Sequence, residues 1–129
     1  MHVTARPLAL DGAIPRDLEV IRTEYVPDDL TVILHALGSA VELSLSFTSV
    51  IGFRVLDERD LLEYWPECST LSGRVFEITS GGWLASESAR PGSLVSVTFP
   101  AAREFLVAGC DSCVSVICTE DPVLQAHAL

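Results

Sequence analysis

Residues Val41–Thr48 alternate apolar and polar side chains without an exception. Successive side chains of a β-strand point to opposite faces of its sheet, so this segment places one face in a core and the other in water. One-sided burial of this kind is typical of antiparallel sheets. The segment therefore predicts a strand that needs paired neighbours, and the rest of the chain repeats the same theme.

Further segments are rich in β-branched and aromatic residues or alternate in the same way, and turn residues separate them. Pro27-Asp28-Asp29 and Gly38-Ser39 mark two tight turns, and residues 109–112 close a final hairpin. Trp83-Leu84-Ala85 favours no single state. The expected additional strands are residues 17–26, 31–37, 53–56, 74–79, 94–99, 103–108 and 113–118.

The hydrophobic period changes at Asp57–Trp65, which we interpret as a short helix. Asp57 can cap its N-terminus, and the acidic residues of the first turn suit the positive end of the helix dipole. Leu61, Leu62 and Trp65 would form the apolar stripe, and Pro66 would end the helix.

These elements predict a mainly β (α+β) fold. We expect a single antiparallel, strongly curved sheet or a partly open barrel of about seven strands, with one short helix. The length of 129 residues indicates a single domain, 1–129. Within it, residues 1–17 are expected to be a loosely ordered lead-in, and residues 121–129 a frayed tail.

The charge of the chain restricts its partners. Eighteen acidic residues stand against eight arginines and no lysine, which gives a net charge of −10. Such a surface repels nucleic acid and anionic lipid, and it favours a basic protein partner. The absence of lysine and asparagine is typical of a GC-rich bacterial genome. With no signal-peptide pattern and no apolar run of about 20 residues, we expect a cytoplasmic protein with reduced cysteines.

Cys110-Asp111-Ser112-Cys113 is the only C-x-x-C motif. A structural zinc site needs four ligands, usually from two such pairs, so Cys110 and Cys113 are weak metal candidates. A redox pair normally lies at a helix N-terminus, whereas this one spans a predicted hairpin turn. We therefore predict ordinary thiols, no bound metal and no cofactor.

The acidic cluster of the predicted helix is a second candidate site. Paired carboxylates can transfer protons or bind a cation, but the spacing matches no calcium loop. The simpler interpretation of the cluster is the capped, solvated start of a helix. If the cluster binds a ligand, a basic protein surface fits it better than a metal ion. Trp83 follows two glycines and is either a core residue or an interface anchor. The partner-binding candidates are Asp57, Glu58, Asp60, Glu63 and Trp83.

Motifs for catalysis are missing from the sequence. It has no G-x-S-x-G nucleophile elbow, and without lysine it has no P-loop. We therefore assign no catalytic residue. An alternative remains open: a barrel that binds a small ligand or a metal, and that could be an enzyme, with His35, Cys113 and Glu77 pointing inward together.

The passages Phe53–Trp65 and Cys113–Val116 resemble a recurring pattern in small uncharacterised bacterial proteins, some of which are immunity partners of polymorphic toxins. This resemblance rests on packing residues and transfers no catalytic residue. It implies a non-enzymatic protein-binding module, which is also our leading interpretation of the charge. A third interpretation is a homo-oligomeric accessory domain, in which exposed edge strands pair with a second copy, for example in a homodimer.

Overall fold

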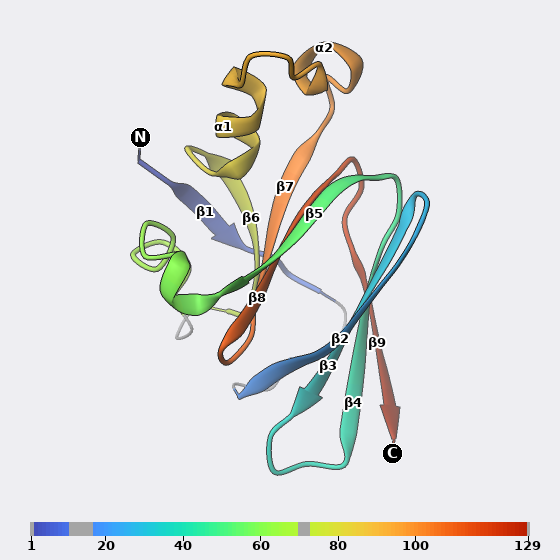
Figure 1. Ribbon diagram of the computed structural model, residues 1–129. Coiled ribbons are helices and arrows are strands. Elements are labelled where there is room, and N and C mark those ends of the chain that lie inside the picture. Colours follow the sequence, from blue (N-terminus) through green and yellow to red (C-terminus); the bar gives the residue numbers. More distant parts are fainter. Residues whose placement is uncertain (1, 11–16, 70–72, 129) are drawn as a thin grey trace.

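The computed structural model describes residues 2–10, 17–69 and 73–128, and their strands form two antiparallel sheets (Figure 1). Sheet A has the order β1-β6-β7-β8-β5, and sheet B has the order β2-β3-β4-β9. The strands of sheet A are β1 (Thr4–Pro7), β5 (Val50–Asp57), β6 (Val75–Ser80), β7 (Arg103–Ala108) and β8 (Ser112–Cys118). Those of sheet B are β2 (Leu18–Val26), β3 (Asp29–Ala36), β4 (Val41–Phe47) and β9 (Val123–Ala128).

The main core lies between the two sheets. The alternating segment is strand β4, and its Leu43, Leu45 and Phe47 are buried in this core, as the sequence predicts. Phe47 packs against Phe105 of β7, with 6.0 Å between ring centroids. The apolar face of sheet B is therefore covered by sheet A.

A second core covers the opposite face of sheet A. Leu61, Tyr64 and Cys68 lie in the segment after β5 and pack with Phe76 and Leu106. Central strands β7 and β8 are consequently buried on both faces. This explains why they have continuous apolar runs in place of alternation.

The predicted mainly β, antiparallel fold is confirmed, but the single curved sheet is wrong. The described strands form two sheets, and these do not close into a barrel. Alternation reports that one face of a strand is buried, but it does not report which sheet the strand joins.

The predicted helix at 57–65 is also wrong in type. Only a 3₁₀ helix, η1 (Glu58–Asp60), forms, with Asp57 as its N-cap. The following turns keep three-residue hydrogen bonds, because Tyr64 N–H donates to Leu61 O and Glu67 N–H donates to Tyr64 O. These tight turns bury Leu61 and Tyr64 against sheet A and leave Leu62 exposed.

Two short α-helices lie beyond the strand ends of sheet A, at the top of Figure 1. Helix α1 (Trp83–Ala89) includes the segment that the sequence left ambiguous. Helix α2 (Val95–Thr98) replaces the strand predicted at 94–99. Neither helix contains a buried residue.

Both chain ends contribute strands that the sequence did not predict. Thr4–Pro7 forms strand β1 and pairs with β6, although residues 1–17 were expected to be a loose lead-in. Residues 1 and 11–16 of that segment lie outside the described residues. Val123–Ala128 pairs with β4 as β9 in place of a frayed tail. Short edge strands carry little sequence signal, because their stability depends on the neighbouring strand.

Candidate functional site

A cleft of about 400 Å³ opens where β5, the turns after η1 and the start of α1 meet. It brings together two residues that the sequence singled out, Glu63 and Trp83, which are 20 positions apart. Asp57, Glu58 and Asp60 do not line it. The lining residues are Arg54, Glu63, Tyr64, Gly81, Gly82, Trp83 and Ser86.

A buried carboxyl group lies beneath this cleft and holds the start of α1. The N-cap residue of α1, Gly82, has no side chain to cap the helix. Instead, Leu84 N–H donates to Glu104 Oε1 (2.8 Å) and Trp83 N–H donates to Tyr64 Oη (2.9 Å). Tyr64 Oη–H in turn donates to Glu104 Oε2 (2.9 Å). The helix start is therefore capped by side chains from β7 and from the turn segment.

The close packing at this point requires glycine. A Cβ atom on Gly82 would lie 2.7 Å from Glu104 Oε1 and 2.7 Å from Ile78 Cγ2. Real Cβ atoms do not approach other atoms so closely, and neither neighbour is free to move, because both belong to the packed face of sheet A. Gly82 thus lets the start of the helix contact the carboxyl group directly.

Burial has the largest effect on the pKa values of Glu104 and Tyr64. Glu104 is only 1% exposed, and burial raises its pKa, although the hydrogen bonds from Leu84 and Tyr64 oppose that rise. Burial also raises the pKa of Tyr64, and the nearby Glu104 charge adds to the effect. Both carboxyl oxygens accept hydrogen bonds from within the fold, so the role that the geometry supports for Glu104 is positioning of α1.

Arg54 is the cation of the cleft. Its guanidinium carbon lies 4.8 Å from the centroid of the Trp83 ring, and its Nη2 donates to Tyr64 Oη at 3.4 Å. Its Nε is buried and has no hydrogen-bond partner among the described residues. Every other described arginine has a carboxylate within 4.0 Å, whereas no described carboxylate lies that close to Arg54. Arg54 thus contacts the Trp83 ring without an ion-pair partner among the described residues.

The predicted acidic cluster is divided by the structure. Asp57 accepts Arg59 N–H (2.8 Å) and forms an ion pair with the Arg59 guanidinium, whose hydrogen bonds lower the Asp57 pKa to about 2. Glu58 lines a separate cleft of about 300 Å³ beside Trp65 and Cys68. In the part of the chain described here, Glu58, Asp60 and Glu63 have no ion-pair partner. Those three carboxylates are free to attract a basic partner.

The cysteine candidates are placed in ordinary thiol environments. Cys110 and Cys113 are free, and buried Cys113 Sγ contacts Gly109 O at 3.8 Å. Burial raises the pKa of Cys113 to about 11 and that of Cys68 to about 12, so both thiols are protonated at neutral pH. Among the described residues, no group of three His, Cys, Asp or Glu side chains could hold a metal ion.

The alternative site at His35, Cys113 and Glu77 is not assembled. His35 lies in sheet B, with Nδ1 3.7 Å from Glu19 and Nε2 3.0 Å from Ser39 O. Cys113 belongs to the second core of sheet A, and Glu77 is held by arginines elsewhere on that sheet. The three side chains have separate partners, so that constellation is wrong.

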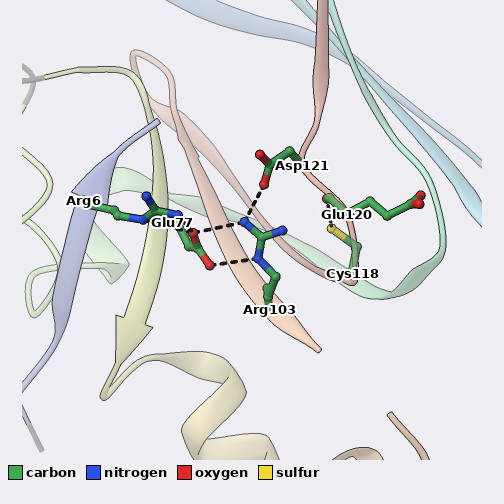
Figure 2. A network of polar contacts seen from close by, with 6 residues as sticks. All are labelled: Arg6, Glu77, Arg103, Cys118, Glu120 and Asp121. Carbon is green, nitrogen blue, oxygen red and sulfur yellow. Dashed lines mark hydrogen bonds and ion pairs between the residues drawn. The ribbon is translucent and has the colours of Figure 1, made fainter. Parts of the chain in front are cut away.

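Sequence reasoning also missed an ionic network on sheet A (Figure 2). Glu77 accepts two hydrogen bonds from Arg103, at 2.9 and 3.1 Å, and pairs with Arg6 of β1. Arg103 also pairs with Asp121, just before β9. These arginines lower the pKa of Glu77. The network joins both terminal segments to the centre of the sheet.

Exposed apolar side chains gather on the segment that carries the two helices. We define residues 83–99 as the helical cap. Val97 is 77% exposed and Leu94 is 67% exposed, and Phe99 is also exposed. The cap therefore presents apolar groups to solvent, and its first residue, Trp83, lines the cleft.

Comparisons with protein-family models, curated proteins and solved structures find no match. In the described part of the chain, no helix has the length and apolar character needed to cross a membrane. The geometry of the cleft and the cap is consequently the basis for a functional assignment.

Proposed function

We propose that the chain is a non-enzymatic protein-binding module and that the helical cap, with the adjoining cleft, is its docking face. The observation that carries this proposal is the exposure of Leu94, Val97 and Phe99 within six residues of chain. Exposed apolar groups that cluster in this way mark contact surfaces of soluble proteins.

The conformation of α2 supports the same proposal. Its sequence, Val-Ser-Val-Thr, is rich in β-branched residues, which disfavour a helix, and four residues are too few for a stable isolated helix. No residue of α2 is buried, so burial within the chain contributes little to its stability. A partner that covered Val97 and Leu94 would supply that burial.

Charge indicates the chemistry of the partner. The chain carries a net charge of −10, and Glu63 at the cleft has no ion-pair partner among the described residues. Long-range attraction would steer a basic protein toward this face, and apolar contact with the cap would then hold it. Trp83 would serve as an anchor at the cleft edge. An immunity-type role in the bacterial cytoplasm, with a toxin as the partner, is the narrowest form of this proposal.

The proposal is tested by capture with matched variants. The immobilised chain is exposed to a lysate of the organism that encodes it, beside the L94S/V97S double variant and E63K. V123S is the control, because Val123 is also an exposed apolar residue but belongs to strand β9 of sheet B. A basic protein that V123S retains, and that L94S/V97S and E63K both lose, is the expected result.

The captured protein is then purified and recombined with the chain. Binding should weaken as salt increases, and reversing the charges of Asp57, Glu58, Asp60 and Glu63 together should weaken it further. Binding that survives both sets of changes would contradict the proposed face and its charge dependence.

A further inference from the structure

Strand β2 is an edge of sheet B, and half of that edge is open. Its neighbour in the sheet is β3, and the pairing register shifts between Val20 and Arg22. Before this bulge, the strand is tied to the β7–β8 hairpin, because Cys110 N–H donates to Leu18 O at 2.7 Å. From Ile21 to Val26, no described strand pairs with the outer edge.

Hairpin geometry determines which backbone groups are free on this edge. Val26 and Asp29 flank the two-residue turn and pair with each other. Hydrogen-bonded pairs alternate along an antiparallel ladder, so Glu24 and Arg22 bond to β3 in the same way as Val26. The N–H and C=O groups of Thr23 and Tyr25 therefore point away from β3, and no described strand pairs with them.

The side chains on the two sides of Thr23 match in chemical type, with a charged residue next to it and an apolar residue beyond. Arg22 and Glu24 carry opposite charges on one face of the strand, where they form an ion pair of 2.6 Å and are both more than half exposed. Ile21 and Tyr25, one position further out on either side, are apolar and about half exposed, although the bulge leaves Ile21 without a partner on β3 and the Tyr25 ring lies 5.2 Å from the Phe53 ring of β5. The sequence Ile-Arg-Thr-Glu-Tyr thus complements itself when it is read in the opposite direction.

We propose that a second copy of this chain pairs with β2 in antiparallel orientation about a two-fold axis at Thr23. Arg22 then faces the partner subunit's Glu24, and Glu24 faces the partner subunit's Arg22. Cross-strand pairs of opposite charge stabilise a sheet, whereas like charges placed opposite each other destabilise it. The two copies of sheet B would join into one continuous sheet across the axis.

The charges select this register from its neighbours. A two-fold axis at Arg22 or at Glu24 would place identical charges directly opposite each other. An axis between two residues would place opposed side chains on different faces of the sheet, which antiparallel pairing does not allow. The axis at Thr23 is the arrangement that sets Arg22 opposite Glu24 while it keeps opposed side chains on the same face.

Multi-angle light scattering after gel filtration, over a concentration series of the full chain, tests the proposal. The wild type should approach twice the chain mass as concentration rises. R22E places Glu opposite Glu at both symmetric positions and should raise the dimer dissociation constant about tenfold or more. E24R should weaken the dimer similarly, although it lowers the net negative charge.

The double variant R22E/E24R restores opposite charges across the axis and should restore the dimer. R90E is the matched control, because Arg90 also forms an exposed ion pair, with Glu87, but lies in the helical cap. R90E changes the net charge as R22E does and should leave the dissociation constant unchanged.

A backbone variant tests the strand pairing itself. T23P removes the outward N–H of Thr23, which edge strands tolerate, and should yield a monomer with the thermal stability of the isolated wild-type chain. A wild type that stays monomeric at every concentration would overturn the proposal. So would a dimer that R22E and E24R leave intact, or one that the double variant fails to restore. None of these results bears on the docking face of the helical cap.

Discussion

At the scale of single residues, Glu104 is the side chain whose loss should matter most. Its two oxygens accept hydrogen bonds from Tyr64 and from Leu84 N–H, and the Glu104 side chain is itself 1% exposed. E104A would leave the buried Tyr64 hydroxyl and the part-buried Leu84 N–H unpaired beside a cavity, so we expect it to cost about 3 kcal/mol of unfolding free energy. E104Q keeps the shape and one acceptor, and it should cost less. Urea unfolding near neutral pH measures both variants.

The pH dependence of Glu104 has a definite sign. An unfolded glutamate titrates near 4.5, and burial raises the pKa of Glu104 in the fold. The unfolded state therefore ionises first, and the stability that the protonated group contributes below pH 4.5 is lost as the pH rises through the folded pKa. The stability of the wild type relative to E104Q should fall over this range. E63Q, at an exposed glutamate, is the control, and an equal slope for E63Q would contradict the prediction.

Glu77 should show the opposite behaviour. Arg103 and Arg6 lower its pKa below the ordinary value of 4.5, so its contribution is present above pH 4.5 and is lost as the pH falls through the folded pKa. Its side chain is 12% exposed, whereas its arginine partners are more exposed, so we expect E77Q to cost only about 1 kcal/mol at pH 7. Urea titrations at several pH values should show this difference vanishing in acid. A difference that persists there would place the effect in packing rather than in charge.

At the scale of elements, the sequence identifies the strands with at least one buried face better than the elements that depend on context. The alternation of β4, the turn at Pro27 and the β7–β8 hairpin are all predicted correctly. Helix α2 is missed because its residues prefer a strand, and the local sequence does not record that this segment joins neither sheet. Local propensity is a weak guide wherever no face is buried.

The limits of local sequence also explain which residues of the candidate site were predicted and which were missed. Glu63 and Trp83 were singled out as an exposed acid and an aromatic beside glycines, and the fold brings them to one cleft. Glu104 was missed, although it left a signal. It shares a strand face with Leu106 and Ala108 in an otherwise apolar run, and a charged residue in such a position requires buried partners. Those partners, Tyr64 and the start of α1, come from segments that the sequence cannot place.

The helical cap should open more readily than the sheets. Its two helices bury no residue, and their backbone hydrogen bonds are therefore protected by little packing. Hydrogen exchange followed by mass spectrometry should show amides of 84–98 exchanging much faster than those of β7 and β8. In E104A, the exchange of α1 should accelerate further, because its cap is lost. Equal protection of cap and sheet would contradict the idea that a partner is needed to cover this segment.

At the scale of the whole molecule, the net charge of −10 should make stability depend on salt. Repulsion among the acidic residues opposes the compact state, and added salt screens it over a Debye length of about 10 Å at 0.1 M. The ion pairs around Glu77 and Arg103 act in the other direction, because salt weakens them as well. Acidic residues exceed basic ones by more than two to one, so screening of the repulsion should dominate. We expect the urea midpoint at pH 7 to rise with sodium chloride.

The sign of this effect should depend on pH. Near pH 4.5, the isoelectric point of the sequence, the net repulsion is absent and only the ion pairs remain to be screened. The salt effect on the urea midpoint should therefore shrink or reverse there. A midpoint that falls with salt at pH 7 would show instead that the network of Arg6, Glu77, Arg103 and Asp121 outweighs the excess of acid. That result would also weaken the case for long-range attraction of a basic partner, because both arguments rest on the same uncompensated charge.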